Sequence, residues 1–198
     1  MTRFMRAYVK YVEAVNYVMG RIAMYMLFVM MGILLWSSIS KTFFVPSIWT
    51  LEMAQFALVA YYLIGGPYSI QLGSNVRMDL VYGSWSNRTK AWVDAFSVFA
   101  LMFYLGVLLY GAVSSTAYSL GYFGSEPFSF FWELIKAFFA DGTAGVKEKI
   151  GFLERSYSSW RPYMAPIKII MTFGIFLMLL QAIAEFFKDI ERIRGEEA

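Results

Sequence analysis

The sequence predicts an all-α, polytopic membrane protein with four transmembrane helices and both termini in the cytoplasm. This prediction rests on the composition, on four long uncharged stretches, and on the placement of lysine and arginine. Of the 198 residues, 59% are apolar and 16% are charged, whereas a soluble domain carries about 25% charged residues. A small soluble domain leaves much of its surface in water and cannot bury so many apolar side chains.

Four uncharged stretches are long enough to cross a bilayer, whose hydrocarbon core of about 30 Å requires about 20 residues of helix. They predict transmembrane helices at residues 22–40, 52–72, 93–118 and 166–187. The third stretch continues uncharged to Ser125, so its helix is expected to end before Gly121. The fourth lies between Lys168 and Glu185, whose side chains can reach water from a helix end. The whole chain is then one membrane domain.

Lysine and arginine predict the orientation of these helices. They are frequent in residues 1–21, between the second and third helices, and in the tail 188–198, whereas the connection between the first two helices holds only Lys41. Because cytoplasmic loops are enriched in these residues, both termini are expected in the cytoplasm and residues 119–165 on the outer side. Five of the six tryptophans lie near the ends of the apolar stretches, as in the aromatic belts at membrane interfaces.

Residues 1–21 have apolar and basic side chains at helical spacing. They fit an amphipathic helix in the membrane interface or a cytoplasmic extension of the first transmembrane helix. A cleavable signal peptide is a third interpretation, with Ser38 and Ser40 as the small residues before the cleavage site. Both the basic region and the apolar run are long for a signal peptide, so we expect the first helix to remain in the chain.

Residues 119–165 are too many for a loop without structure of its own. Ser125-Glu126-Pro127 is typical of a helix start and Asp141-Gly142 of a helix end. A second, amphipathic helix is predicted from a stripe of apolar residues: Val146, Ile150, Leu153 and Tyr157. We therefore expect a helical periplasmic insertion.

The first of these two helices is apolar on nearly all sides, with Glu133 and Lys136 as its only charges. Such a helix must be covered, either by the outer headgroup region or by another subunit. Phe131 and Phe138 are therefore candidate docking residues, and anchoring in the interface is the alternative.

Several classes of function are excluded by missing residue types. Cysteine and histidine are absent, which removes disulfides, Cys/His zinc sites, histidine-ligated haem and Ser-His-Asp catalysis. The apolar cores of the predicted helices hold no ionisable group, whereas an ion-coupled carrier acting alone usually has one. No basic run suggests nucleic-acid binding. We expect no catalytic, substrate-binding or metal residue and no cofactor.

Small residues indicate surfaces for helix packing. Gly111 and Ser115 form a small-xxx-small pair on the third predicted helix, and Gly106 lies further back on the same helix. Gly174 on the fourth helix offers a weaker contact. The Gly65-Gly66-Pro67 sequence is expected to kink or end the second helix, the alternative being a substrate site in a broken helix.

Three stretches in a fixed order carry a resemblance to a known family. The first has Trp-Thr-Leu-Glu at 49–52 and Gly-Gly-Pro-Tyr at 65–68, the second Asn-Val-Arg-Met-Asp-Leu at 75–80, and the third runs from Glu154 to Gln181. Together they resemble the small (Q- or DctQ-type) membrane subunit of tripartite ATP-independent periplasmic (TRAP) transporters. The third stretch is similar to the branch often labelled mannitol or chloroaromatic transport. The apolar segment 122–151 departs from the shorter members of the family.

The resemblance implies a role within a larger assembly. A large (M-type) membrane subunit would hold the ion and substrate sites, with sodium as the expected ion, and would move by an elevator mechanism. A periplasmic (P-type) binding protein would deliver an organic acid or a similar solute. The small subunit would act as a scaffold among the lipids of a bacterial or archaeal inner membrane. The alternatives from other classes are a haem-free membrane anchor, a homo-oligomeric small carrier and, least favoured, a membrane enzyme.

The candidate residues are assigned to subunit contacts or to structure. Glu52 is interpreted as a contact with the large subunit or as an interfacial charge, and Arg77 with Asp79 as an ion pair or a cytoplasmic contact. Trp160 and Pro162 would fix the entry into the fourth helix. The full set is Glu52, Arg77, Asp79, Gly106, Gly111, Ser115, Phe131, Phe138, Trp160, Pro162 and Gln181.

Overall fold

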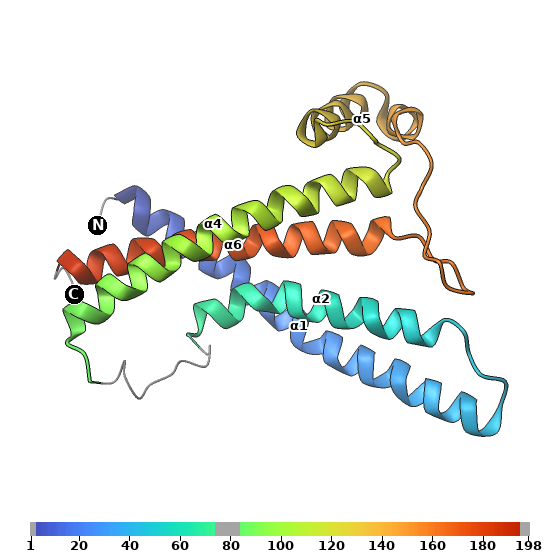
Figure 1. Ribbon diagram of the computed structural model, residues 1–198, viewed down its shortest axis with the longest axis horizontal. Helices are drawn as coiled ribbons and strands as arrows, with labels where there is room; N and C mark the ends of the chain where they lie inside the picture. Colours follow the sequence, from blue (N-terminus) through green and yellow to red (C-terminus); the bar gives the residue numbers. More distant parts are fainter. Residues whose placement is uncertain (1–2, 74–83, 195–198) are drawn as a thin grey trace.

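The computed structural model describes residues 3–73 and 84–194, and this part of the chain is helical (Figure 1). Its helices are α1 (Arg3–Phe43), α2 (Thr50–Gln71), α4 (Asn87–Ser119), α5 (Pro127–Lys149) and α6 (Ala165–Arg194). Within the described ranges the only β-type pairing is an isolated bridge between Arg155 and Tyr163. The predicted all-α class is therefore confirmed.

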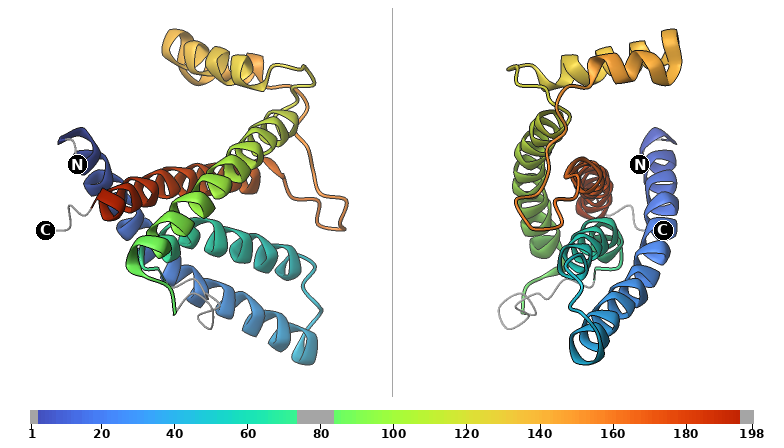
Figure 2. Two further views of the ribbon diagram at one scale, coloured as in Figure 1. Left: turned by 60° about the vertical axis from the view of Figure 1, so that its left-hand side comes forward. Right: turned by 90° about the vertical axis from the view of Figure 1, so that its right-hand side faces the viewer.

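The four long helices form two neighbouring pairs, α1 with α2 and α4 with α6. α6 joins the pairs, because it also contacts α2 and α1. The start of α1 and the end of α6 lie at one end of the molecule, together with the start of α4 (Figure 1). α5 lies across the opposite end, roughly perpendicular to the other helices (Figure 2).

Three of the helices are long and apolar enough to cross a membrane, namely α1, α4 and α6, each with a mean hydropathy of 2.1 over its best window. α2 also lacks charge after Glu52, but glutamine, tyrosine and the Gly65-Gly66-Pro67 sequence lower its hydropathy. The chain therefore has a multi-pass membrane architecture, and the fourth crossing, by α2, stays a prediction.

The helix ends extend beyond the predicted membrane boundaries. α4 begins at Asn87 rather than at residue 93, and the Oγ of its N-cap Ser86 accepts a hydrogen bond from the backbone N–H of Thr89 at 3.2 Å. Such a cap satisfies one of the unpaired N–H groups of the first turn. Residues 3–21 continue without a break into the first apolar stretch as part of α1. Whether they lie in the interface stays a prediction.

The second half of the segment between α4 and α6 differs from its prediction. α5 is interrupted at Gly142, with a φ of +63°, where the sequence predicted a helix end. The second amphipathic helix, predicted through Tyr157, stops at Lys149, so that prediction is wrong beyond this residue. The physical reason is that the next backbone N–H groups bond elsewhere: Gly151 donates to Leu120 at 3.0 Å, and Glu154 donates to Ser119 at 3.1 Å.

Glycines produce the closest helix contacts. A Cβ added at Gly174 of α6 would lie 2.6 Å from the carbonyl oxygen of Leu63, so α6 meets the backbone of α2 directly. A Cβ at Gly20 of α1 would overlap the ring of Tyr68. By contrast, a Cβ at Gly106 or Gly111 of α4 would meet nothing within 4 Å. The two glycines that the sequence favoured for packing are therefore not packed within this chain.

Candidate subunit interface

The apolar surface is distributed unevenly over the helices. Only 6% of the membrane-spanning window of α1 and 17% of that of α4 is buried, compared with 39% for α6. Viewed along the long axis, α1 and α4 lie at opposite edges, with α2 and α6 between them (Figure 2). The two edge helices therefore present large apolar surfaces that lipid or another subunit must cover.

A row of hydrogen-bonded polar side chains joins α1 to α6, near the end of the molecule where α1 starts and α6 ends. The Asn16 amide nitrogen donates to the Gln181 side-chain oxygen at 2.7 Å, and both residues are 0% exposed. The Gln181 amide nitrogen in turn donates to the Glu185 carboxylate at 2.9 Å. Lys188 forms ion pairs with Glu185, at 2.8 Å, and with Glu13 of α1.

The Glu185 carboxylate determines which group donates in each of these hydrogen bonds. An ionised carboxylate only accepts hydrogen bonds, so Gln181 must present its NH₂ group to Glu185 and its oxygen to Asn16. Asn16 must then donate, and its own oxygen Oδ1 is buried without a donor among the described residues. The acceptor without a donor therefore lies at the α1 end of this row of polar side chains.

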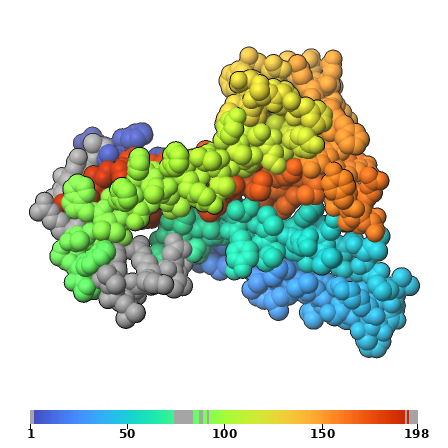
Figure 3. All heavy atoms as spheres, viewed as in Figure 1, coloured from blue at the N-terminus to red at the C-terminus, as the bar shows by residue number. Residues whose placement is uncertain are grey.

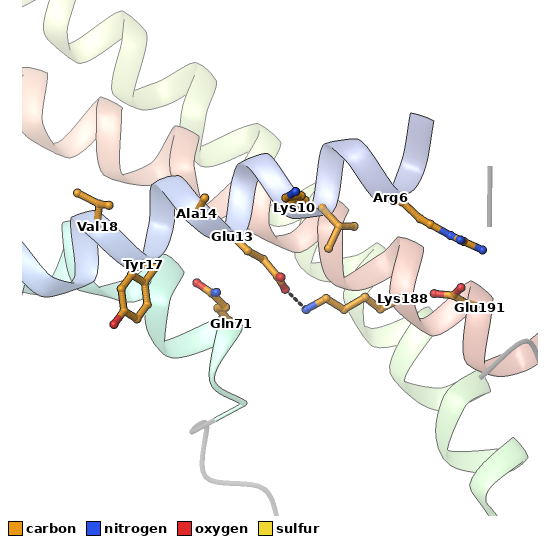
Figure 4. Close-up of a pocket in the computed structure, with 10 residues that line it drawn as sticks. Arg6, Lys10, Glu13, Ala14, Tyr17, Val18, Gln71, Lys188 and Glu191 are labelled. Carbon is orange, nitrogen blue, oxygen red and sulfur yellow. Dashed lines mark ion pairs between the residues drawn. The ribbon is translucent and has the colours of Figure 1, made fainter. Parts of the chain in front are cut away.

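A cleft lies beside this row of polar side chains, between α1, the end of α2 and α6 (Figure 4). Its volume is about 750 Å³. The Glu13–Lys188 ion pair crosses it from α1 to α6, and Gln71 reaches it from α2 (Figure 4). The Gln71 side-chain oxygen is buried without a hydrogen-bond donor in the part of the chain that the structure describes.

A second polar cluster joins the connection between α5 and α6 to the helices. The Ser156 hydroxyl donates to one Glu52 oxygen at 2.5 Å, and the other Glu52 oxygen is buried without a partner among the described residues. Lys168 at the start of α6 pairs with Glu154 at 2.5 Å. The 150–164 segment (orange) thereby extends from α5 to the N-terminal end of α2 (Figure 3).

Several of the candidate residues from the sequence form hydrogen bonds to other residues of the same chain. Glu52 bonds to Ser156, and Gln181 bonds to Asn16 and Glu185. The carbonyl oxygen of Ser115 accepts from Lys168 at 3.4 Å. These contacts give the residues internal structural roles. Arg77 and Asp79 lie outside the described residues.

The remaining candidates divide into covered and uncovered residues. Phe131 is half-buried against the core formed by Ala117, Leu120, Phe130 and Ala165, whereas Phe138 is 54% exposed. The Pro162 carbonyl accepts from the N–H of Ser156 at 2.9 Å, while Trp160 is exposed. Of the two phenylalanines proposed for docking, Phe138 is the more exposed.

Sequence reasoning did not identify Asn16, Glu13 or Lys188 as a linked group. One signal was present: Asn16 is a polar residue between Val12, Val15 and Met19 on the apolar stripe of the first helix. A buried amide on such a stripe needs a polar partner. The partner on α6 is 165 residues away in the sequence, and a single sequence offers no means of pairing them.

The long apolar helices α1, α4 and α6 define a multi-pass helical membrane protein. Within the described residues no group of three or more acidic, histidine or cysteine side chains is placed to hold a metal ion. A family model of the DctQ component of tripartite ATP-independent periplasmic transporters matches residues 30–140. The match covers more than half of the chain, so the chain belongs to the DctQ family and is a small component of a TRAP transporter. No curated protein and no solved structure matches it.

Proposed function

We propose that this chain is the non-catalytic scaffold subunit of its transporter. It braces a large membrane subunit, which carries out sodium-coupled symport of an organic acid or a similar solute delivered by a periplasmic binding protein. The observation that carries this proposal is the DctQ match. The little-buried apolar edges of α1 and α4 support it, because a bracing subunit needs a broad apolar surface for its partner.

The α4 edge is the surface that we assign to the large subunit. Gly106 and Gly111 lie open on α4, and small residues allow the backbone of a second helix to approach closely. Exposed aromatic side chains lie on the same face of α4 as Gly106, including Phe99, Phe103 and Tyr110. All of these residues lie within the matched range 30–140, whereas α6 lies beyond it.

Purification in a mild detergent tests the proposal. A tagged chain taken from its native membrane is expected to carry along a larger membrane protein in stoichiometric amount, identified by mass spectrometry. Gly111→Leu is expected to lower that recovery about tenfold or more, because a side chain at a close helix contact costs about 1–3 kcal/mol. Gly32→Leu is the matched control, since Gly32 also lies open but on α1.

Two results would contradict this assignment. Recovery of the chain alone, or only with itself, counts against a scaffold subunit, and solute uptake by the chain alone in liposomes would favour the homo-oligomeric carrier. Equal losses from Gly111→Leu and Gly32→Leu would reject the α4 edge as the specific contact.

We also propose that α2 crosses the membrane and that both termini are cytoplasmic. α2 is packed between α1 and α6, and it carries no charged residue after Glu52. The lack of cysteine in the natural chain allows single cysteines to be placed as reporters. Val45→Cys, between α1 and α2, is expected to react with an impermeant maleimide applied outside the cell. Ser84→Cys, before α4, is expected to react only after the membrane is opened.

The labelling of these two cysteines shows whether α2 crosses the membrane. Labelling of both cysteines from the same side would show that α2 does not cross. Phe139→Cys on α5, where the native side chain is 83% exposed, serves as the reference for the outer side.

A further inference from the structure

The cleft between α1, α2 and α6 lies where the membrane-spanning part of the molecule meets its charged end. It is lined by Arg6, Val9, Lys10, Glu13, Ala14, Tyr17, Val18, Gln71, Lys188 and Glu191. Along α1 this lining covers about 18 Å, at about 1.5 Å per residue, and it ends four residues before the uncharged stretch that starts at Ile22. Its charged part is therefore expected at the depth of lipid headgroups, and its apolar part toward the acyl chains.

The cationic side of the cleft is formed by Arg6 and Lys10. They lie one helical turn apart, so their side chains share a face of α1. Among the described residues neither forms an ion pair with a carboxylate, since Glu13 pairs with Lys188 instead. Two neighbouring cations without a partner are suited to a phosphate group.

The cleft also contains acceptors that lack a donor. The Gln71 oxygen is buried and has no hydrogen-bond donor in the described part of the chain. Glu191 also lines the cleft, and no described residue forms an ion pair with its carboxylate. An unmet buried acceptor destabilises the protein, so a ligand that donates a hydrogen bond to it gains binding affinity.

We propose that this cleft binds the headgroup of a zwitterionic phospholipid that carries a primary ammonium group, as phosphatidylethanolamine does. The phosphate lies against Arg6 and Lys10, and the ammonium group donates to Gln71. Tyr17 and Val18, 43% and 53% exposed, continue the cleft toward the apolar stretch and contact an acyl chain.

The unpaired groups select among headgroups. Phosphatidylcholine has the same charges but no N–H, so it cannot donate to Gln71. Phosphatidylglycerol can donate to Gln71 only through a neutral hydroxyl group, which forms a weaker hydrogen bond than an ammonium group does. The expected order of affinity is therefore ethanolamine, then glycerol, then choline. The site is independent of the partner surface on α4, since the cleft is lined by α1, α2 and α6.

The test is lipid retention by the full chain, purified with its copurifying subunit. Native mass spectrometry would measure binding of the three lipids with identical acyl chains, and soluble phosphoethanolamine would form a fourth arm. Ethanolamine lipid is expected to bind about tenfold more tightly than choline lipid, the equivalent of one charge-assisted hydrogen bond. Arg6→Ala with Lys10→Ala should weaken binding of all three lipids.

Two substitutions at Gln71 distinguish a loss of headgroup preference from a general loss of folding. Gln71→Leu is expected to abolish the preference for ethanolamine over choline, whereas Gln71→Glu should keep or increase it. Arg3→Ala, an exposed basic residue outside the cleft lining, should change nothing. Equal binding of the three lipids by the natural chain, or equal effects of Arg3→Ala and the Arg6/Lys10 variant, would overturn the site. Binding of phosphoethanolamine without any lipid preference would overturn a lipid as the ligand.

Discussion

Gly174→Leu is expected to separate the two helix pairs and to prevent a stable fold in detergent. The Cβ alone would lie 2.6 Å from the carbonyl oxygen of Leu63 and 2.8 Å from its carbonyl carbon. These are backbone atoms of α2, so no rotamer change relieves the overlap. Overpacking typically costs about 1–3 kcal/mol, and a rigid backbone contact places this variant at the upper end of that range or above it.

The effect should be graded and specific to this contact. Gly174→Ala is expected to lower the melting temperature measurably, and Gly174→Leu to give little monodisperse protein in size-exclusion chromatography. Gly106→Leu is the matched control, because the space around Gly106 is open. If Gly174→Leu melted at the same temperature as Gly106→Leu, the close approach of α2 and α6 would be wrong.

The membrane segments were predictable because they depend on composition over about 20 residues. Counting charges placed the start of the third membrane segment at residue 93, but α4 begins at Asn87. A charge such as Asp94 limits how much of a helix lies in lipid, whereas hydrogen bonding at the N-cap Ser86 determines where the helix starts. Charge patterns in the sequence therefore do not locate the ends of the helices.

Contacts between distant segments were not predictable from a single sequence. The small-residue pattern on α4 was visible, but the glycine that meets another backbone is Gly174. A local pattern shows that a helix can be approached closely and does not show by which neighbour. The same limit applies to Glu52, because its acceptor role toward Ser156 joins residues that are 104 positions apart.

The connection between α5 and α6 shows how tertiary hydrogen bonds override a helical pattern. The apolar stripe through Leu153 and Tyr157 has helical spacing, yet this part of the chain is extended and irregular. The Gly121 turn has a φ of +86°, and its backbone touches Gly151 so closely that a Cβ at Gly121 would lie 2.7 Å from the Gly151 Cα. Periodicity alone carries no information about such a contact.

Gln181→Leu is expected to destabilise the protein by about 1–2 kcal/mol, through loss of the buried amide pair. The substitution leaves the NH₂ group of Asn16 without an acceptor and Glu185 without a donor from Gln181. Asn16→Leu should cost a similar amount, since it leaves the Gln181 oxygen unpaired. Thermal unfolding in the same detergent measures each change.

The double variant decides whether these losses come from the pair. With both residues replaced by leucine, neither amide is left unpaired and two apolar side chains meet at the α1–α6 crossing, so the double variant should lose less than the sum of the single changes. Gln55→Leu is the matched control, because Gln55 is exposed on α2 and its replacement leaves no buried partner. Additive losses at Asn16 and Gln181 would contradict a direct hydrogen bond. A loss of stability at Gln55 as large as that at Gln181 would mean that replacing a glutamine in either helix destabilises the protein, whether or not the glutamine is buried.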